Sequence, residues 1–393
     1  MNAMGSFTAN RLADRVRRVA AIAAQYTNQV DAENRVPREA VEALKIEKLL
    51  SVMVPVELGG EGATTAEIAD ACAILGTACG SSAMIFAMHQ IKMSSLVEHG
   101  MGSEWHRDLM ARICAEQLVM GSATTEAGIG GNLRNSICHV EVTGDRFKLD
   151  KAASCISYAE ISDAIMVTSR AHKDAAPTDQ VMTVVMKDQY SLERTHEWNV
   201  LGMRGTRSEG FMFRSEGDAC QILPQPFAEI AAESMLAQAH ILWGALWWGI
   251  AADACARAQS FIRSEARRNP GQTPVGAPHL VKALGHLQMI KSNLLVAIDQ
   301  YEMAKRDHDY LQSVGYGVAI NLLKVTTSET ILEIINECMN VCGLPGYRMD
   351  TPYSLGRHLR DAHSAQLMIS NDRVKLNVAG MLAMTKPDTS LLG

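Results

Sequence analysis

The sequence VMGSATTEAGIGGN spans residues 119–132, where helical periodicity gives way to runs of β-branched residues. It contains two adjacent hydroxyl side chains, Thr124 and Thr125, followed by a glycine-rich run that includes Gly130 and Gly131. Glycines allow a backbone to approach a ligand closely, and short hydroxyl side chains and free N–H groups can hydrogen-bond it. We interpret the stretch as a cofactor loop, although a tight turn between two strands fits the same residues.

Two common nucleotide-binding patterns do not match this loop. No Gly-Lys-Ser/Thr follows the glycines, as a Walker A loop requires. The residues after Asn132 have the pattern of a strand, whereas a Rossmann loop opens a helix. The ligand is therefore not a nucleotide held in either of these ways.

The chain around the loop divides into three segments by periodicity. Apolar residues recur at helical spacing over residues 1–117, alternate as in strands over 118–226, and return to helical spacing over 227–393. Three turn-rich runs interrupt the last segment, which predicts four long helices. These runs are residues 269–271, 315–317 and 343–346. The predicted fold is α+β and mainly α: an N-terminal helical domain, a middle antiparallel β domain and a C-terminal four-helix bundle.

Composition sets further bounds. The 393-residue chain is 47% hydrophobic and 20% charged, with a net charge of −6, and its scattered basic residues argue against a nucleic-acid partner. The longest apolar run, residues 241–252, is too short to cross a bilayer, and no secretory signal is evident. Nine cysteines without a CxxC pair predict reduced thiols and no metal site. We therefore expect a cytoplasmic protein with no membrane partner.

Three motifs in order resemble those of the acyl-CoA dehydrogenase superfamily. TEAGIGGN at 125–132 is similar to the family loop T-E-P-x-x-G-S-D, LGMRGT at 201–206 to the turn L-G-x-R-x-S/T, and RDA at 360–362 to a late signature. The resemblance covers nearly the whole length. It implies an FAD-carrying homotetramer or homodimer, with the flavin ring between the β domain and the bundle. It also implies an acyl thioester of CoA or acyl carrier protein as substrate, and an electron acceptor such as electron-transfer flavoprotein or O₂.

The resemblance also assigns residues to the flavin ring. Thr124 and Thr125 would meet the ring, and in the strand ASCIS at 153–157 the hydroxyl of Ser157 would donate to flavin N5. Cys155 stands where the family has a stacking Trp. A hydroxyl donor near N5 stabilises the charge that accumulates when the ring accepts a hydride. A strand serine bonded to backbone is the alternative for Ser157.

Further cofactor contacts are expected in the C-terminal segment. Arg267 matches the arginine of the family turn R-x-x-F-G-x-P, which reaches the FAD pyrophosphate of a neighbouring subunit, although Pro270 replaces the Phe. The turn NVCGLPGY at 340–347 is similar to Q-x-x-G-G-x-G-Y and implies contacts from Asn340 and Gly343. Asn371 is also expected to contact the cofactor.

The catalytic base of the family is missing. Its Glu lies eight residues after the Asp of R-D-A, which here is Ile369, and the alternative position on the first bundle helix falls near Ile241. A dehydrogenase would then use another base, with His240 or His363 as candidates, because neutral imidazole accepts protons near pH 7. A monooxygenase would use Ser157 with His89 or His363. Each histidine also fits an ordinary hydrogen-bonded core or surface residue.

Three motif residues also have a structural interpretation. Arg360 and Asp361 are expected to form an ion pair with each other, and Glu126 is expected to cap a turn. The resemblance of the TEAG loop favours an acyl thioester dehydrogenase first and a flavin monooxygenase of the same fold second. A catalytically silent flavin-binding subunit stays open as a third reading.

Overall fold

The structure, a computed structural model, describes residues 3–129 and 132–386. Five helices precede the first strand: α1 (Ala3–Glu33), α2 (Arg38–Ile46), α3 (Thr65–Ala78), α4 (Gly80–Gly100) and α5 (Glu104–Glu116). Pro37 directly precedes α2, as its fixed φ favours at a helix start. Thr64 and Glu67 form a reciprocal capping box at α3. The helical character predicted for the first segment is confirmed.

Two sheets follow. One has the order β1-β4-β5 and the other β2-β3-β7-β6. The strands are β1 (Met120–Ala123), β2 (Val140–Thr143), β3 (Arg146–Ile156), β4 (Ala164–Arg170), β5 (Gln180–Met186), β6 (Tyr190–His196) and β7 (Glu209–Asp218). Most pairs are antiparallel as predicted, but β1 pairs with β4 in parallel. The cofactor loop therefore leaves the carboxyl end of an edge strand.

Helices return after the strands. A π-helical turn, η6 (Ala231–Met235), joins α6 (Phe227–Ile230) to α7, and the later helices form the bundle. They are α7 (Leu236–Arg268), α8 (Ala277–Ala304), α9 (His308–Leu311), α10 (Val314–Cys342), α11 (Leu344–Tyr347), α12 (Gly356–Leu367) and α13 (Asn371–Met381). Three of these are long, and the expected fourth long helix is instead the pair α12 and α13.

The predicted break at residues 315–317 is wrong, because these residues form the first turn of α10. Ser313 accepts a hydrogen bond from Tyr316 N–H and caps that helix, so two glycines in the first turn are tolerated. The connection between α8 and α10 lies at residues 305–313. A further break was not predicted: Ile369 has φ of +51° and separates α12 from α13.

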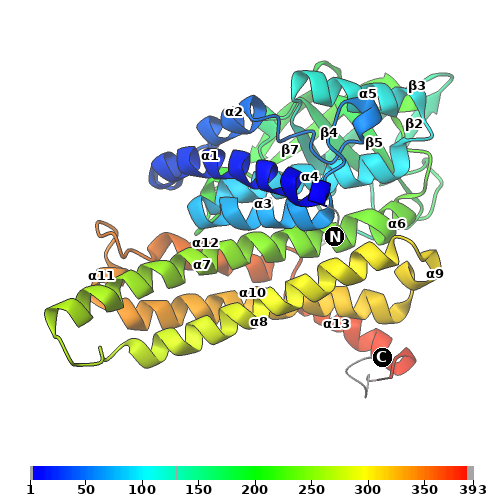
Figure 1. The fold of residues 1–393 in the computed structure, drawn as a ribbon. Helices are drawn as coiled ribbons and strands as arrows, with labels where there is room; N and C mark the ends of the chain where they lie inside the picture. Colours follow the sequence, from blue (N-terminus) through cyan, green and yellow to red (C-terminus); the bar gives the residue numbers. More distant parts are fainter. Residues whose placement is uncertain (1–2, 130–131, 387–393) are drawn as a thin grey trace.

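The N-terminal helices and the bundle share one hydrophobic core, and the strands have a second. α3 lies along α7 in Figure 1, with the sheets on one side of this pair and the bundle on the other. Gly76 and Gly249 lie at the crossing, where a side chain on either would meet the backbone of the other helix. Within the described chain, no helix combines the length and apolarity needed to cross a membrane.

Candidate functional site

A chain of hydroxyl groups ends at Ser157. Thr206 donates to the Met203 carbonyl at 2.9 Å, Thr206 and Ser208 are 2.9 Å apart, and Ser208 and Ser157 are 2.7 Å apart. A carbonyl can only accept, so the single hydrogen of Thr206 is used, and Ser208 must donate to Thr206. Ser157 in turn must donate to Ser208. Its oxygen is left with lone pairs, so Ser157 is an acceptor toward a further ligand.

The backbone around Ser157 is strained. Tyr158, Met203 and Arg207 all have positive φ, at 43°, 51° and 44°. Such conformations are uncommon outside glycine, and they gather at functional sites where the surrounding structure enforces them. Here Tyr158 N–H donates to the Thr206 carbonyl at 2.7 Å, and its buried hydroxyl donates to the Met120 carbonyl at 3.0 Å. These bonds hold Ser157 against both β1 and the turn at 201–206.

Thr125 of the loop contacts the same strand, β3. The Thr125 hydroxyl donates to the Cys155 carbonyl at 3.1 Å and accepts from Cys155 N–H at 3.2 Å. The register of β3 and β7 shifts between Ala153 and Ile156, so Cys155 lies in a β-bulge, a feature that re-aims side chains beside sites. The structure therefore brings Thr125 and Cys155 into contact, and Thr124 and Ser157 lie one and two positions from them in the chain. Gly130 and Gly131 lie outside the described residues.

Glu126 connects the loop after β1 to residues 136–138. Its carboxylate accepts from Ser136 Oγ at 2.8 Å and from the N–H groups of Ile137 and Cys138 at 3.0 and 2.7 Å, and Lys151 Nζ is 3.7 Å away. Burial raises the pKa of Glu126, but Lys151 and these donors more than offset that effect and hold the pKa below its ordinary value. Glu126 is thus an ionised structural residue, consistent with the expected capping role.

The two late-signature residues do not pair with each other, contrary to expectation. Asp361 accepts from Met203 N–H at 2.6 Å and lies 3.9 Å from Arg357, while Arg360 pairs with Asp31 of α1 and donates to the Leu201 carbonyl. Both side chains therefore fasten α12 to the turn at 201–206. Through Met203 they also support the hydroxyl chain that ends at Ser157.

A buried lysine occupies the region of the missing base. Lys324 Nζ donates to the Ile369 carbonyl at 2.6 Å and to Asn371 Oδ1 at 2.5 Å, and burial lowers its pKa to about 8. Asn371 Nδ2 donates to Ser328 and Glu329. The amide predicted to contact the cofactor is thus fully engaged inside the chain. Lys324 was missed in the sequence, where a lysine among apolar helical positions was its only signal.

The three candidate histidines lie in different surroundings. His89 accepts from Met120 N–H at Nδ1, so its Nε2–H donates to the Leu50 carbonyl, and both nitrogens are used. His240 donates from Nδ1 to the Ile320 carbonyl at 3.0 Å, and its buried Nε2 has no partner among the residues that the structure describes. Burial lowers the pKa of both to about 4. His363 is exposed on α12. The structure does not gather them around Ser157.

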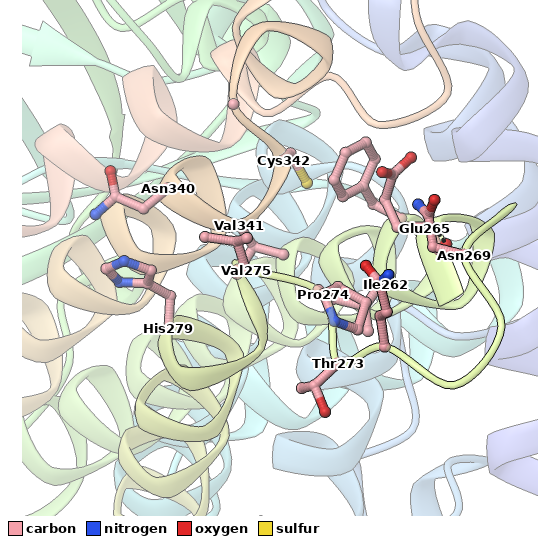
Figure 2. A pocket seen from close by; sticks show the side chains of 14 residues that line it. Ile262, Glu265, Asn269, Thr273, Pro274, Val275, His279, Asn340, Val341 and Cys342 are labelled. Carbon is pink, nitrogen blue, oxygen red and sulfur yellow. Dashed lines mark hydrogen bonds between the residues drawn. The ribbon is translucent and has the colours of Figure 1, made fainter. Parts of the chain in front are cut away.

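A cavity of about 410 Å³ lies at the tip of the bundle, and two of the other predicted cofactor residues line it. Asn340 at the end of α10 and Gly343 directly after it line one part of the cavity, and Glu265 at the end of α7 and Asn269 directly after it line another. Figure 2 shows Glu265 and Asn269 across the cavity from Asn340 and His279. Arg267 is exposed beside it, and the described residues offer it no hydrogen bond or ion pair. Figure 1 shows this tip away from the strands.

A second cavity of about 410 Å³ lies where the loop after β1 approaches the bundle. Arg134 lines it from the loop, Leu236 from the start of α7, and Tyr316 and Asn321 from α10. The Tyr316 hydroxyl is buried without a partner among the described residues. An apolar cavity with a few polar groups is typical of a small-molecule site.

The fold has counterparts in known proteins. The family models for the N-terminal and C-terminal domains of acyl-CoA dehydrogenase match residues 8–118 and 229–380. This chain belongs to the acyl-CoA dehydrogenase superfamily.

The similarity to particular members extends over nearly the whole chain at low identity. The cyclohex-1-ene-1-carbonyl-CoA dehydrogenase of Syntrophus aciditrophicus (strain SB) is 22% identical over 90% of this chain and 84% of that protein. The probable FMNH₂-dependent monooxygenase SfnC of Pseudomonas putida is 22% identical over 83% of this chain and 84% of its own length. FMN-bound TdsC from Paenibacillus sp. A11-2 superposes with a TM-score of 0.83 and 16% identity, over 98% of this chain and 100% of TdsC. Dehydrogenases and oxygenases therefore share this architecture.

Proposed function

We propose that this chain is a flavin-dependent oxidoreductase whose reduced flavin reacts with O₂, as in a monooxygenase. The observation that carries the proposal is that no carboxylate stands at either position where the family places its proton acceptor for thioester dehydrogenation. Isoleucines, Ile369 and Ile241, occupy both positions where a glutamate is expected. His240, next to Ile241 in the chain, is hydrogen-bonded to α10 and has a pKa of about 4, so it is a weak base. The monooxygenase is thus ranked above the acyl thioester dehydrogenase, which is the reverse of the ranking that the loop sequence favours.

The residues at Ser157 fit a flavin ring. The hydroxyl chain leaves Ser157 as an acceptor, which suits the N5–H of reduced flavin better than the unprotonated N5 of oxidised flavin. Thr124 and Thr125 on the loop and Cys155 in the bulge would border the ring. Reduced flavin supplies two electrons and two protons to O₂, so that one oxygen atom can enter the substrate and the other leaves as water. The protein would bind and orient the flavin and the substrate, and would exclude water from them.

The bundle-tip cavity supports FAD as the flavin. Asn340 offers an amide, Gly343 a bare backbone and Arg267 an unused guanidinium, and a planar guanidinium suits phosphate oxygens. Because the tip lies away from Ser157, we infer that each chain lends its tip to the flavin of another copy. Chromatography of the released cofactor separates FAD from FMN, the flavin bound to TdsC.

The second candidate is an acyl thioester dehydrogenase with a displaced base. The whole-length similarity to a cyclohexene-carbonyl-CoA dehydrogenase favours it. The two proposals differ in what reduces the flavin. A dehydrogenase takes electrons from the thioester, whereas an oxygenase needs a separate reductant.

Rapid-mixing absorbance spectroscopy distinguishes them. Flavin-loaded protein is mixed anaerobically with acyl-CoA thioesters from butyryl-CoA upward. We expect the oxidised flavin spectrum to persist, and dithionite-reduced protein to reoxidise when O₂ is added. Bleaching by any thioester would contradict the oxygenase proposal, and abolition of that bleaching in a His240→Gln variant would establish the displaced base.

A further inference from the structure

The outer side of α8 is apolar although it is exposed. The helix packs on α7 and α10 through a buried side. This buried side consists of Leu280, Ala283, Ile290, Leu294, Ala297, Tyr301 and Ala304. Five further apolar side chains of α8 are at least 54% exposed: Val281, Met289, Leu295, Val296 and Met303. A helix that is apolar on both sides is typical of a protein interior, so the outer side of α8 lacks a cover.

These exposed side chains form one continuous strip. With 3.6 residues per turn, each of the five lies within about 60° of Ser292 around the helix axis. Asp299 is the one charged residue in the same strip. Figure 1 shows α8 along the side of the bundle that lies away from the strands. Single exposed apolar residues are ordinary, whereas a continuous apolar strip marks an interaction surface. We call the strip the α8 face: Val281, Met289, Ser292, Leu295, Val296 and Met303.

The α8 face is arranged symmetrically about Ser292. Val281 and Met303 are each eleven residues from Ser292, and Met289 and Leu295 are each three residues from it. In a twofold interface, a residue of one copy meets a second residue of the other copy, and the reverse contact is made as well. Antiparallel pairing about a twofold axis at Ser292 would set Val281 of one copy level with Met303 of the other. The face therefore complements itself.

The charges of α8 favour the same orientation. Its basic residues, Lys282 and Lys291, lie in the N-terminal half, and its acidic residues, Asp299 and Glu302, lie in the C-terminal half. Antiparallel pairing of two α8 helices sets opposite charges against each other, whereas parallel pairing sets like charges against each other. Complementary charges determine orientation and suppress wrong pairings. A second, antiparallel copy of this chain thus suits both the apolar strip and the charges.

The same pairing bears on where the bundle tip of a second copy would lie. α8 begins at the tip, where His279 lines the cavity, and it ends where the Tyr301 hydroxyl donates to the Glu233 carbonyl of η6 at 3.3 Å. η6 directly follows α6, the first α-helix after the strands. Antiparallel pairing would therefore place the tip of one copy beside the end of the other bundle that connects to the strands.

We propose that the α8 face is the contact between two copies of this chain, paired antiparallel about a twofold axis close to Ser292. The inference goes beyond the proposed function, because it is argued from α8 and does not depend on what reacts with the flavin. It assigns a surface and an orientation to the assembly in which one copy lends its tip to another.

Disulfide cross-linking tests the register. Ser292→Cys oxidised with diamide should run as a covalent dimer on a non-reducing gel, because the two Ser292 positions meet at the axis. Val281→Cys is the matched control on the same face, since its two copies would lie about 33 Å apart along the helices at 1.5 Å per residue. Wild-type protein gives the background from the native cysteines, of which Cys220 is exposed. Cross-linking of Val281→Cys as readily as Ser292→Cys would overturn the antiparallel pairing.

Light scattering of the flavin-loaded protein tests the contact itself. We expect wild-type protein to self-associate and Val296→Glu to weaken that association at least tenfold, because it places a carboxylate in the apolar strip. Val56→Glu is the matched control, since Val56 is 69% exposed on η1 (Val56–Leu58), and it should leave the molar mass unchanged. Far-UV circular dichroism should show equal helix content in all three proteins.

Two results would overturn the proposal: a monomeric wild-type protein, or an association that Val296→Glu leaves unchanged. Cosedimentation of a wild-type monomer with phosphatidylcholine vesicles would assign the α8 face to a lipid surface instead. Flavin absorbance of the same samples reports on the proposed function separately, because a dimer without flavin would refute that function and keep the interface.

Discussion

At the scale of single residues, the direction of the hydroxyl chain determines what Ser157 can offer a flavin. Ser208→Ala removes the acceptor at 2.7 Å, so the Ser157 hydrogen becomes free to point outward. One neutral hydrogen bond contributes about 1 kcal/mol, and about 1.4 kcal/mol corresponds to roughly 30 mV for a two-electron couple. We expect the reduction potential of the bound flavin to fall by roughly 20 mV in spectroelectrochemical titration. Ser208→Thr keeps the hydroxyl and should restore the potential, and an unchanged value in Ser208→Ala would contradict the assigned polarity.

The buried histidines predict how stability depends on pH. Burial holds the pKa of His89, His240 and His358 near 4, below the ordinary value of 6.5. The unfolded chain binds their protons first, so their contribution is complete above pH 6.5 and is lost as the pH falls toward 4. The loss is about 1.4 kcal/mol per pH unit for each histidine.

Urea unfolding at a series of pH values measures this slope. His89→Gln should lower stability by about 1–3 kcal/mol at pH 7, because it disturbs two buried hydrogen bonds. The variant should also lose the contribution of one histidine to the slope of unfolding free energy against pH between pH 6.5 and 4. His363→Gln is the control, since His363 is exposed and should change neither quantity. A pH-independent stability between 6.5 and 4 would refute the assignment of these histidines as buried and neutral.

Sequence reasoning predicted which candidate residues lie near one another better than it described their bonds. The motifs predicted that Thr125 and Cys155 lie together, and the structure joins them by two hydrogen bonds. The partners of Ser157 and Lys324 could not be predicted, because those contacts join residues 51 and 45 positions apart in the chain. Asn371 illustrates the same limit, since its predicted ligand contact competes with an internal network that only the fold brings together.

At the scale of elements, the crossing of α3 and α7 is the most restrictive contact. A Cβ on Gly249 would overlap the Ala73 carbonyl of α3. Gly249→Ala should therefore lower the free energy of unfolding by about 1–3 kcal/mol through overpacking. Gly285→Ala on α8 is the matched control, because nothing lies within 4 Å of its Cβ and alanine is the better helix former by about 1 kcal/mol. Equal urea unfolding midpoints for the two variants would contradict the close contact between α3 and α7 at Gly249.

Element boundaries were predictable where local chemistry set them. Pro37 before α2 and the glycines after α10 mark helix ends with their own backbone preferences. The break at Ile369 was not predictable in this way, because isoleucine disfavours positive φ. Its carbonyl is held by Lys324 from another helix, so tertiary contacts override the local preference.

At the scale of the whole molecule, the separation of Ser157 from the bundle tip predicts a shared cofactor. Arg267→Ala should reduce flavin retention and leave the melting temperature of flavin-free protein unchanged, because the exposed side chain has no partner in the described chain. Arg268→Ala is the neighbouring control, since Arg268 pairs with Glu265 at 2.9 Å. Light scattering combined with flavin absorbance measures both assembly and retention. A stable flavin-loaded monomer, or an equal loss in both variants, would contradict a shared site.

The measurement that tests the central claim most directly is the affinity of the protein for reduced and oxidised flavin. Anaerobic titrations with FAD and FMN, each in both redox states, give four dissociation constants on one preparation. The oxygen-reacting flavoprotein described above, with Ser157 as an acceptor, predicts tighter binding of the reduced form and FAD as the preferred flavin. Tighter binding of the oxidised form would contradict the role of Ser157, and failure to bind flavin in any form would contradict the function itself.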